Sequence, residues 1–203
     1  MSDISALYLR EMSVVKSRYY YLYFRTRGWI GRTVSINVIK LEECALQMRL
    51  LIEGVVLAAA HANAEYYGEE LNELKRDWRL KDLTLKMKRV GLHHFPEPCD
   101  FGINADGKYF LHALKDKILN FDELFRLHGS MGNLLHRRFH FLDTNKTHDI
   151  TQEIINFLPE IKNHLSKHVL YIRTDDGLKV LVVNMNFHRK KTCECMEMDL
   201  KRI

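Results

Sequence analysis

The segment Gly132-Asn133-Leu134-Leu135-His136 contains residues that could do chemistry, an amide and an imidazole at helical spacing. Side chains three, four, seven and eight positions apart stack on one helix face, which here predicts a shared side for Gly129, Gly132, Asn133, His136 and His140. Glycine lowers the stability of a helix by about 1 kcal/mol relative to alanine, so the presence of two glycines in this helix requires a structural explanation. We expect a second helix or a ligand to approach this face closely.

A second helix supplies candidate partners for that face. Glu53 interrupts the apolar run from Leu50 to Ala60, and Arg49 precedes it by one helical turn. An ionisable side chain in apolar surroundings needs a charged or hydrogen-bonding partner. We therefore predict one polar cluster between the two helices, made by Arg49, Glu53, Asn133 and His136. Such a cluster would either fix the register of a helical bundle or serve as a catalytic site.

The Gly-Asn pair followed by a His, in a helical context, resembles the last motif helix of HEPN-type domains, over residues 35 to 168. The resemblance implies a helical bundle of the kind found in prokaryotic toxins and phage-defence proteins. Many members are metal-independent endoribonucleases, whose Arg and His perform acid–base work and phosphate stabilisation.

This chain departs from the catalytic pattern of that family. Catalytic members carry an Arg with four to six residues between it and the His, and the corresponding positions here are Gly129, Ser130 and Met131. The resemblance therefore implies a ribonuclease only if another arginine substitutes in space, the candidates being Arg126, Arg137 and Arg138. Asn133, His136, Glu53 and Arg49 would then be the catalytic residues.

The pattern of apolar residues predicts an α+β fold. Residues 1 to 168 have mainly helical periodicity, with a central helix from about Ser35 to Tyr67 capped by Thr33 or Ser35. A hairpin is expected near residues 101 to 110, around the turn Ala105-Asp106-Gly107. Residues 169 to 203 alternate and predict a three-stranded antiparallel meander, packed on the bundle or on a partner. Its open edge favours protein partners or self-association.

Basic charge favours a phosphate-bearing partner. The formal net charge is +5, and Arg18, Arg25 and Arg27 frame a dense aromatic run that could stack bases. Arg137 and Arg138 are further candidates for nucleic-acid contact. Aromatic clusters at such spacings are more often part of a core or an interface.

Other functional classes lack their signals. The sequence has no glycine-rich phosphate loop and no paired Cys-x-x-Cys motif, so neither a cofactor nor a metal site is predicted. No apolar run approaches the ~20 residues of a membrane span, and unpaired thiols favour a cytoplasmic location. The expected function is a non-catalytic accessory component of a prokaryotic nucleic-acid-directed system, such as phage defence. The alternatives are a HEPN-like endoribonuclease and a structural homo-oligomer.

Overall fold

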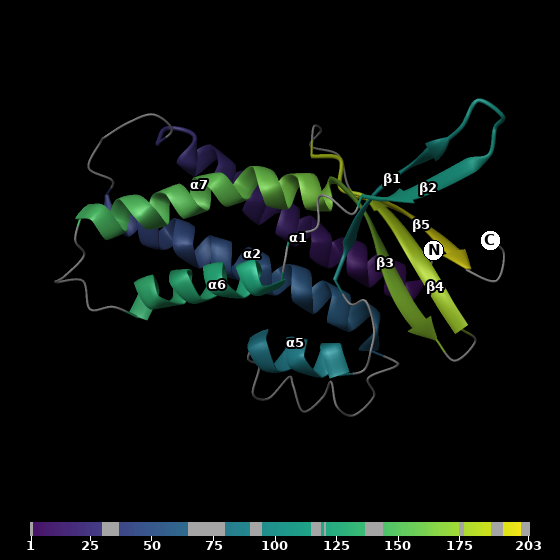
Figure 1. The fold of residues 1–203 in the computed structure, drawn as a ribbon, viewed down its shortest axis with the longest axis horizontal. Coiled ribbons are helices and arrows are strands. Elements are labelled where there is room, and N and C mark those ends of the chain that lie inside the picture. Colours follow the sequence, from purple (N-terminus) through teal and green to yellow (C-terminus); the bar gives the residue numbers. More distant parts are fainter. Residues whose placement is uncertain are drawn as a thin grey trace.

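The computed structural model of the chain has an α+β fold, in which a group of helices forms one half and a five-stranded antiparallel sheet the other (Figure 1). The structure describes residues 2–29, 37–64, 80–89, 95–114, 119, 121–136, 144–174, 177–187 and 193–199. The described helices are α1 (Asp3–Thr26), α2 (Val38–Ala62), α5 (Leu80–Arg89), α6 (Phe121–His136) and α7 (Thr144–Ser166). The strands are β1 (Glu97–Ile103), β2 (Tyr109–Ala113), β3 (Lys167–Thr174), β4 (Gly177–Asn184) and β5 (Glu194–Asp199).

Helix α2 is the centre of the helical half. It packs against α1, α5, α6 and α7, and its buried side chains belong to one core that also includes residues of the sheet. Gly54 permits the close approach of α1, because a Cβ at this position would lie 3.0 Å from Cγ2 of Val15. Apolar residues almost all round this helix are therefore explained by neighbours on several sides.

The ends of α2 differ from the prediction. The helix begins at Val38, with the Asn37 side chain accepting a hydrogen bond from the Ile39 amide at 2.9 Å. The predicted caps, Thr33 and Ser35, lie outside the described residues. At the other end the buried Asn63 caps the helix and bonds to β3, donating to the Tyr171 carbonyl and accepting from the Arg173 amide. The cap thus also joins the central helix to the sheet.

Among the described helices, α2 alone has the length and apolar composition of a membrane span. Of its most apolar 18-residue window, 56% is buried inside the protein. Core helices of globular proteins pass the same test, so this is weak evidence for a membrane helix.

The sheet has the order β2-β1-β3-β4-β5, with every neighbouring pair antiparallel. Alternation along the strands gives it two apolar faces. The first face packs on the helices through residues such as Leu170, Leu181 and Val183. The opposite face has a smaller cluster of its own, centred on Cys99, Val169, Val180 and Val182.

The predicted hairpin and meander are both present, and they form one sheet. The hairpin turns through Asn104 to Gly107, where Gly107 has a φ of +77° that favours glycine. Strand β1 then pairs with β3, with Glu97 opposite Val169 and Pro98 opposite His168. The meander begins at Lys167, directly after α7.

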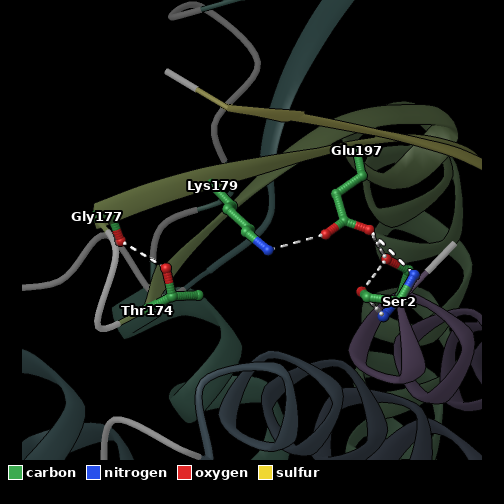
Figure 2. Close-up of polar contacts among 6 residues, drawn as sticks. Ser2, Thr174, Gly177, Lys179 and Glu197 are labelled. Carbon is green, nitrogen blue, oxygen red and sulfur yellow. Dashed lines mark hydrogen bonds and ion pairs between the residues drawn. The ribbon is translucent and has the colours of Figure 1, made fainter. Parts of the chain in front are cut away.

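A carboxylate fastens β5 to the first turn of α1. The Ser5 hydroxyl donates to Oε2 of Glu197 at 2.8 Å, and the Ser2 amide donates to the same oxygen at 3.3 Å. Lys179 on β4 reaches Oε1 of Glu197 at 3.5 Å (Figure 2). Burial raises the pKa of the Glu197 carboxyl. The hydrogen bonds from Ser5 and Ser2 and the charge of Lys179 lower it by a larger amount, so the pKa is lowered overall.

His168 is a fully buried titratable group at the junction of the two halves. Its Nε2 lies 2.9 Å from the Tyr8 hydroxyl on α1, and its Nδ1 lies 2.9 Å from the Leu165 carbonyl. Burial is the main cause that lowers the pKa of His168 to about 4; the Leu165 carbonyl opposes this shift and the charge of His164 adds to it. The imidazole is therefore neutral in the folded protein at neutral pH.

His168 predicts a loss of stability in mild acid. The unfolded chain binds a proton near pH 6.5 and the folded chain only near pH 4, so the stabilisation holds above the first value and is lost as pH falls towards the second. We expect the free energy of unfolding to fall by about 2 kcal/mol between pH 7.5 and pH 5 from this group alone. Urea unfolding at the two pH values measures the change. His168→Gln, which does not titrate, should show a smaller fall, and an equal fall in both proteins would contradict the assignment.

Candidate functional site

The polar cluster between α2 and α6 is built on the carboxylate of Glu53. Oε1 of Glu53 lies 2.7 Å from Nε2 of His128 on α6 and 3.3 Å from Nε of Arg49, one turn earlier on α2. The side chains of Glu53 and His128 are 14% and 18% exposed. Because the three groups are largely shielded from water, their interaction is stronger than that of a surface ion pair.

The environment keeps Glu53 ionised. Burial raises the pKa of this carboxyl, but the hydrogen bond and charge of His128 together with Arg49 outweigh burial, and the pKa is lowered overall. The imidazole has its Nδ1 left over, which makes no hydrogen bond to a described residue. A carboxylate thus holds the ring of His128 through one of its two nitrogens.

Gly132 makes room for the Arg49 guanidinium. A Cβ at Gly132 would lie 3.3 Å from Nη1 of Arg49, so the glycine lets this side chain of α2 lie against α6. The expected close approach is therefore confirmed at Gly132. It is wrong at Gly129, where a Cβ would meet nothing within 4 Å.

Two of the predicted cluster residues are not in it. Arg49 and Glu53 are brought together, but Asn133 and His136 are exposed. His136 is two turns beyond His128, about 12 Å along the helix axis. Asn133 and His136 lie outside the cluster because of the way α6 is rotated about its own axis relative to α2. Its core positions are Leu124, Leu127, Met131 and Leu134, which turn His128 and Gly132 to the edge of α2 and point Asn133 and His136 outward.

His128 is the site residue that the sequence analysis missed. The signal that could have found it was its place next to the core residue Leu127 and one turn before Gly132. If the buried face of this helix had been assigned from its leucines and Met131 and not from its glycines, His128 would have been predicted to lie towards α2.

The cluster lines a pocket with a volume of about 770 Å³ between α2, α5 and α6. Basic, acidic and apolar side chains share its wall: Arg49, Glu53, Leu80, Lys81, Asp122, Phe125, Arg126 and His128. Arg126 also forms an ion pair with Glu153 at 2.5 Å, whereas Lys81 is exposed and has no ion-pair partner among the described residues. The lining combines three cations, Arg49, Lys81 and Arg126, with the carboxylates of Glu53 and Asp122, so the pocket could hold an anionic group against its cations, beside the imidazole of His128.

The arginines predicted to contact nucleic acid lie elsewhere or outside the described residues. Arg18 donates to Gln47 at 2.6 Å, and Arg25 pairs with Glu43 at 3.1 Å, so both join α1 to α2. Arg27 is exposed at the end of α1. None of these three lines the pocket. Arg137 and Arg138 lie outside the described residues.

No group of three or more metal-binding side chains is found in the part of the chain that the structure describes. Comparison with known proteins adds no relative, since no protein-family model, no curated protein and no solved structure matches this chain. The resemblance to HEPN-type domains accordingly stays a prediction from the short motif.

The two glycines of α6 allow a matched test of the Arg49 contact. Gly129→Ala should raise the free energy of unfolding by about 1 kcal/mol, because alanine favours the helix and its methyl group meets nothing. Gly132→Ala should gain less, since Arg49 has to shift to admit the methyl group. Urea unfolding measures both changes. Repeating them in an Arg49→Ala background should make the two gains equal, and a persisting difference would show that Arg49 is not the cause.

Proposed function

We propose that this chain is a nucleic-acid-binding accessory protein whose α2–α6 pocket holds a phosphate group of the bound strand. The observation that carries the proposal is the gathering of Arg49, Lys81 and Arg126 around one pocket. Guanidinium and ammonium groups are the usual protein ligands of phosphate. The formal net charge of +5 would add a long-range attraction for the same class of partner.

An exposed cation in the pocket favours binding over a purely structural role. Glu53 offsets Arg49, Glu153 offsets Arg126, and Asp122 is a further carboxylate of the lining, while Lys81 projects from α5 as an exposed cation with no ion-pair partner among the described residues. An incoming phosphate would therefore find the exposed Lys81 and the less exposed guanidinium of Arg49 in the same lining. The HEPN-type resemblance extends this proposal to a prokaryotic nucleic-acid-directed system such as phage defence.

Lys81 provides the test of phosphate binding. Lys81→Ala should weaken the binding of labelled single-stranded RNA about tenfold at low salt and reduce the slope of log K against log salt by about 1. Fluorescence anisotropy across a salt series measures both quantities. Lys40→Ala removes the same charge from an exposed position on α2 away from the pocket lining and is the matched control. Equal losses in the two variants, or no binding by the wild type at low salt, would overturn the proposal.

A second candidate, a metal-independent endoribonuclease, is favoured by the Glu53–His128 pair. We propose for it that Nδ1 of His128 takes the proton of an RNA 2′-hydroxyl as that oxygen attacks phosphorus. The bond to the 5′-oxygen would break, the leaving oxygen would take a proton from water, and the product would be a 2′,3′-cyclic phosphate. Arg49 would stabilise the negative charge that develops on the phosphoryl oxygens.

Two histidines on α6 separate this candidate from the family-based alternative. Labelled RNA should be cut in the presence of EDTA, and His128→Ala should lower the rate by about 10²- to 10⁴-fold. His136→Ala, which changes an exposed histidine of the same helix, should leave the rate unchanged. Loss of cleavage in His136→Ala alone would place the chemistry at the family motif. Absence of cleavage by the wild type would leave the chain without this activity.

A further inference from the structure

The β1–β2 hairpin projects from the sheet with an unpaired edge (Figure 1). Within the described residues, β1 contacts β3 through Glu97 and Pro98, and its remaining residues have β2 as their strand neighbour. No described strand pairs with the outer edge of β2. An isolated two-stranded ribbon is marginally stable in water, so this segment would gain stability from a further strand.

The hydrogen-bond pattern of the hairpin shows which backbone groups of β2 point outward. Leu114 donates to the Pro98 carbonyl at 2.8 Å, and the Asn104 amide donates to the Lys108 carbonyl at 2.9 Å. The even-numbered residues of this segment therefore direct their backbone groups towards β1. Because these groups alternate along an antiparallel strand, Tyr109, Leu111 and Ala113 direct theirs to the open side.

The two edges of the sheet differ in the side chains that protect them. Strand β5, at one edge, carries Glu194, Glu197 and Asp199, and like charges of this kind oppose pairing with a second copy. Strand β2, at the other edge, reads Tyr-Phe-Leu-His-Ala and has no Asp, Glu, Lys, Arg or proline. The edge of β2 therefore lacks the features that usually prevent strand addition.

We propose that a second copy of this chain adds its β2 antiparallel to this edge, with the two-fold axis at Leu111. Outward groups have to face outward groups, so the axis passes through a residue and not between two, and an axis at the central residue of β2 pairs the whole five-residue strand. Tyr109 then lies opposite Ala113 of the second copy, a large side chain against a small one. Phe110 lies opposite His112 of the second copy, and such aromatic pairs stabilise neighbouring strands. The two sheets become continuous.

This register also keeps the lysines of the hairpin apart. Lys108 falls opposite Leu114 of the second copy, so that no like charges face each other directly. The exposed side chain of Tyr109, 69% accessible, lies on the edge strand that the second copy would meet. A heterologous strand would need no such self-complementarity, which is why the observations favour a second copy.

Backbone chemistry at Tyr109 tests the interface. Tyr109→Pro removes an outward amide without removing a bond to β1, and should convert a dimer of the wild type into a monomer. Tyr109→Ala retains the amide and should remain dimeric. Light scattering after size exclusion measures the masses, and circular dichroism confirms folding. A monomeric wild type at its highest soluble concentration, or a dimeric Tyr109→Pro, would overturn the proposal.

Cysteine cross-linking tests the register even if the proline variant does not fold. In the proposed register Leu111→Cys brings two Cα atoms to about 5.5 Å, which a disulfide can bridge. Tyr109→Cys leaves its two copies about 14 Å apart and should not cross-link. The wild type, in which Cys44, Cys99 and Cys193 are buried and Cys195 is partly exposed, is the control under the same mild oxidation. Cross-linking of Tyr109→Cys in preference to Leu111→Cys would overturn the register.

Discussion

The helical half of the molecule depends on how a carboxylate in the middle of an apolar helix is kept charged. Glu53 lies among residues of α2 that are buried against α1 and α6, and its desolvation has to be offset by partners. Arg49 can reach it from the same helix, but His128 can do so only if α6 is rotated to face α2. That rotation places Gly132 under the Arg49 guanidinium and turns His136 to solvent. The charge pair and the apolar core therefore specify the same orientation of α6.

The parts of the fold that were predicted are those with local signals. Alternating apolar residues gave β3 and β4, and the Ala105-Asp106-Gly107 turn marked the β1–β2 hairpin. The pairing of β1 with β3 had no local signal, because Glu97 and Val169 are far apart in the sequence and the contact is made by two residue pairs. The prediction therefore gave the hairpin and the meander as separate units, although they share one sheet.

The candidate site was half predicted, and the error has a physical cause. Arg49 and Glu53 were recognised because a charged group in an apolar run needs a partner. The partner of Arg49 and Glu53 on α6 was misplaced because the glycines were taken to mark the face of α6 that contacts α2. Successive residues of a helix are about 100° apart around its axis, so a face assigned from the wrong residues points in a different direction. Gly132 does mark a contact, but Gly129 does not, so two glycines three residues apart pointed to a face shifted away from His128.

The proposed dimer and the proposed binding site reinforce each other physically. The pocket is lined by α2, α5 and α6, whereas the proposed interface is on β2, so that pairing of two chains would leave both pockets open. A single phosphate pocket with partly neutralised arginines would bind a strand weakly. Two such pockets, one in the helical half of each chain of a dimer joined through a continuous sheet, would hold the same strand at two points, and the second contact would form at a high effective concentration. The gain requires a strand long enough to span both pockets, so affinity should rise with strand length for the dimer and much less for a monomer.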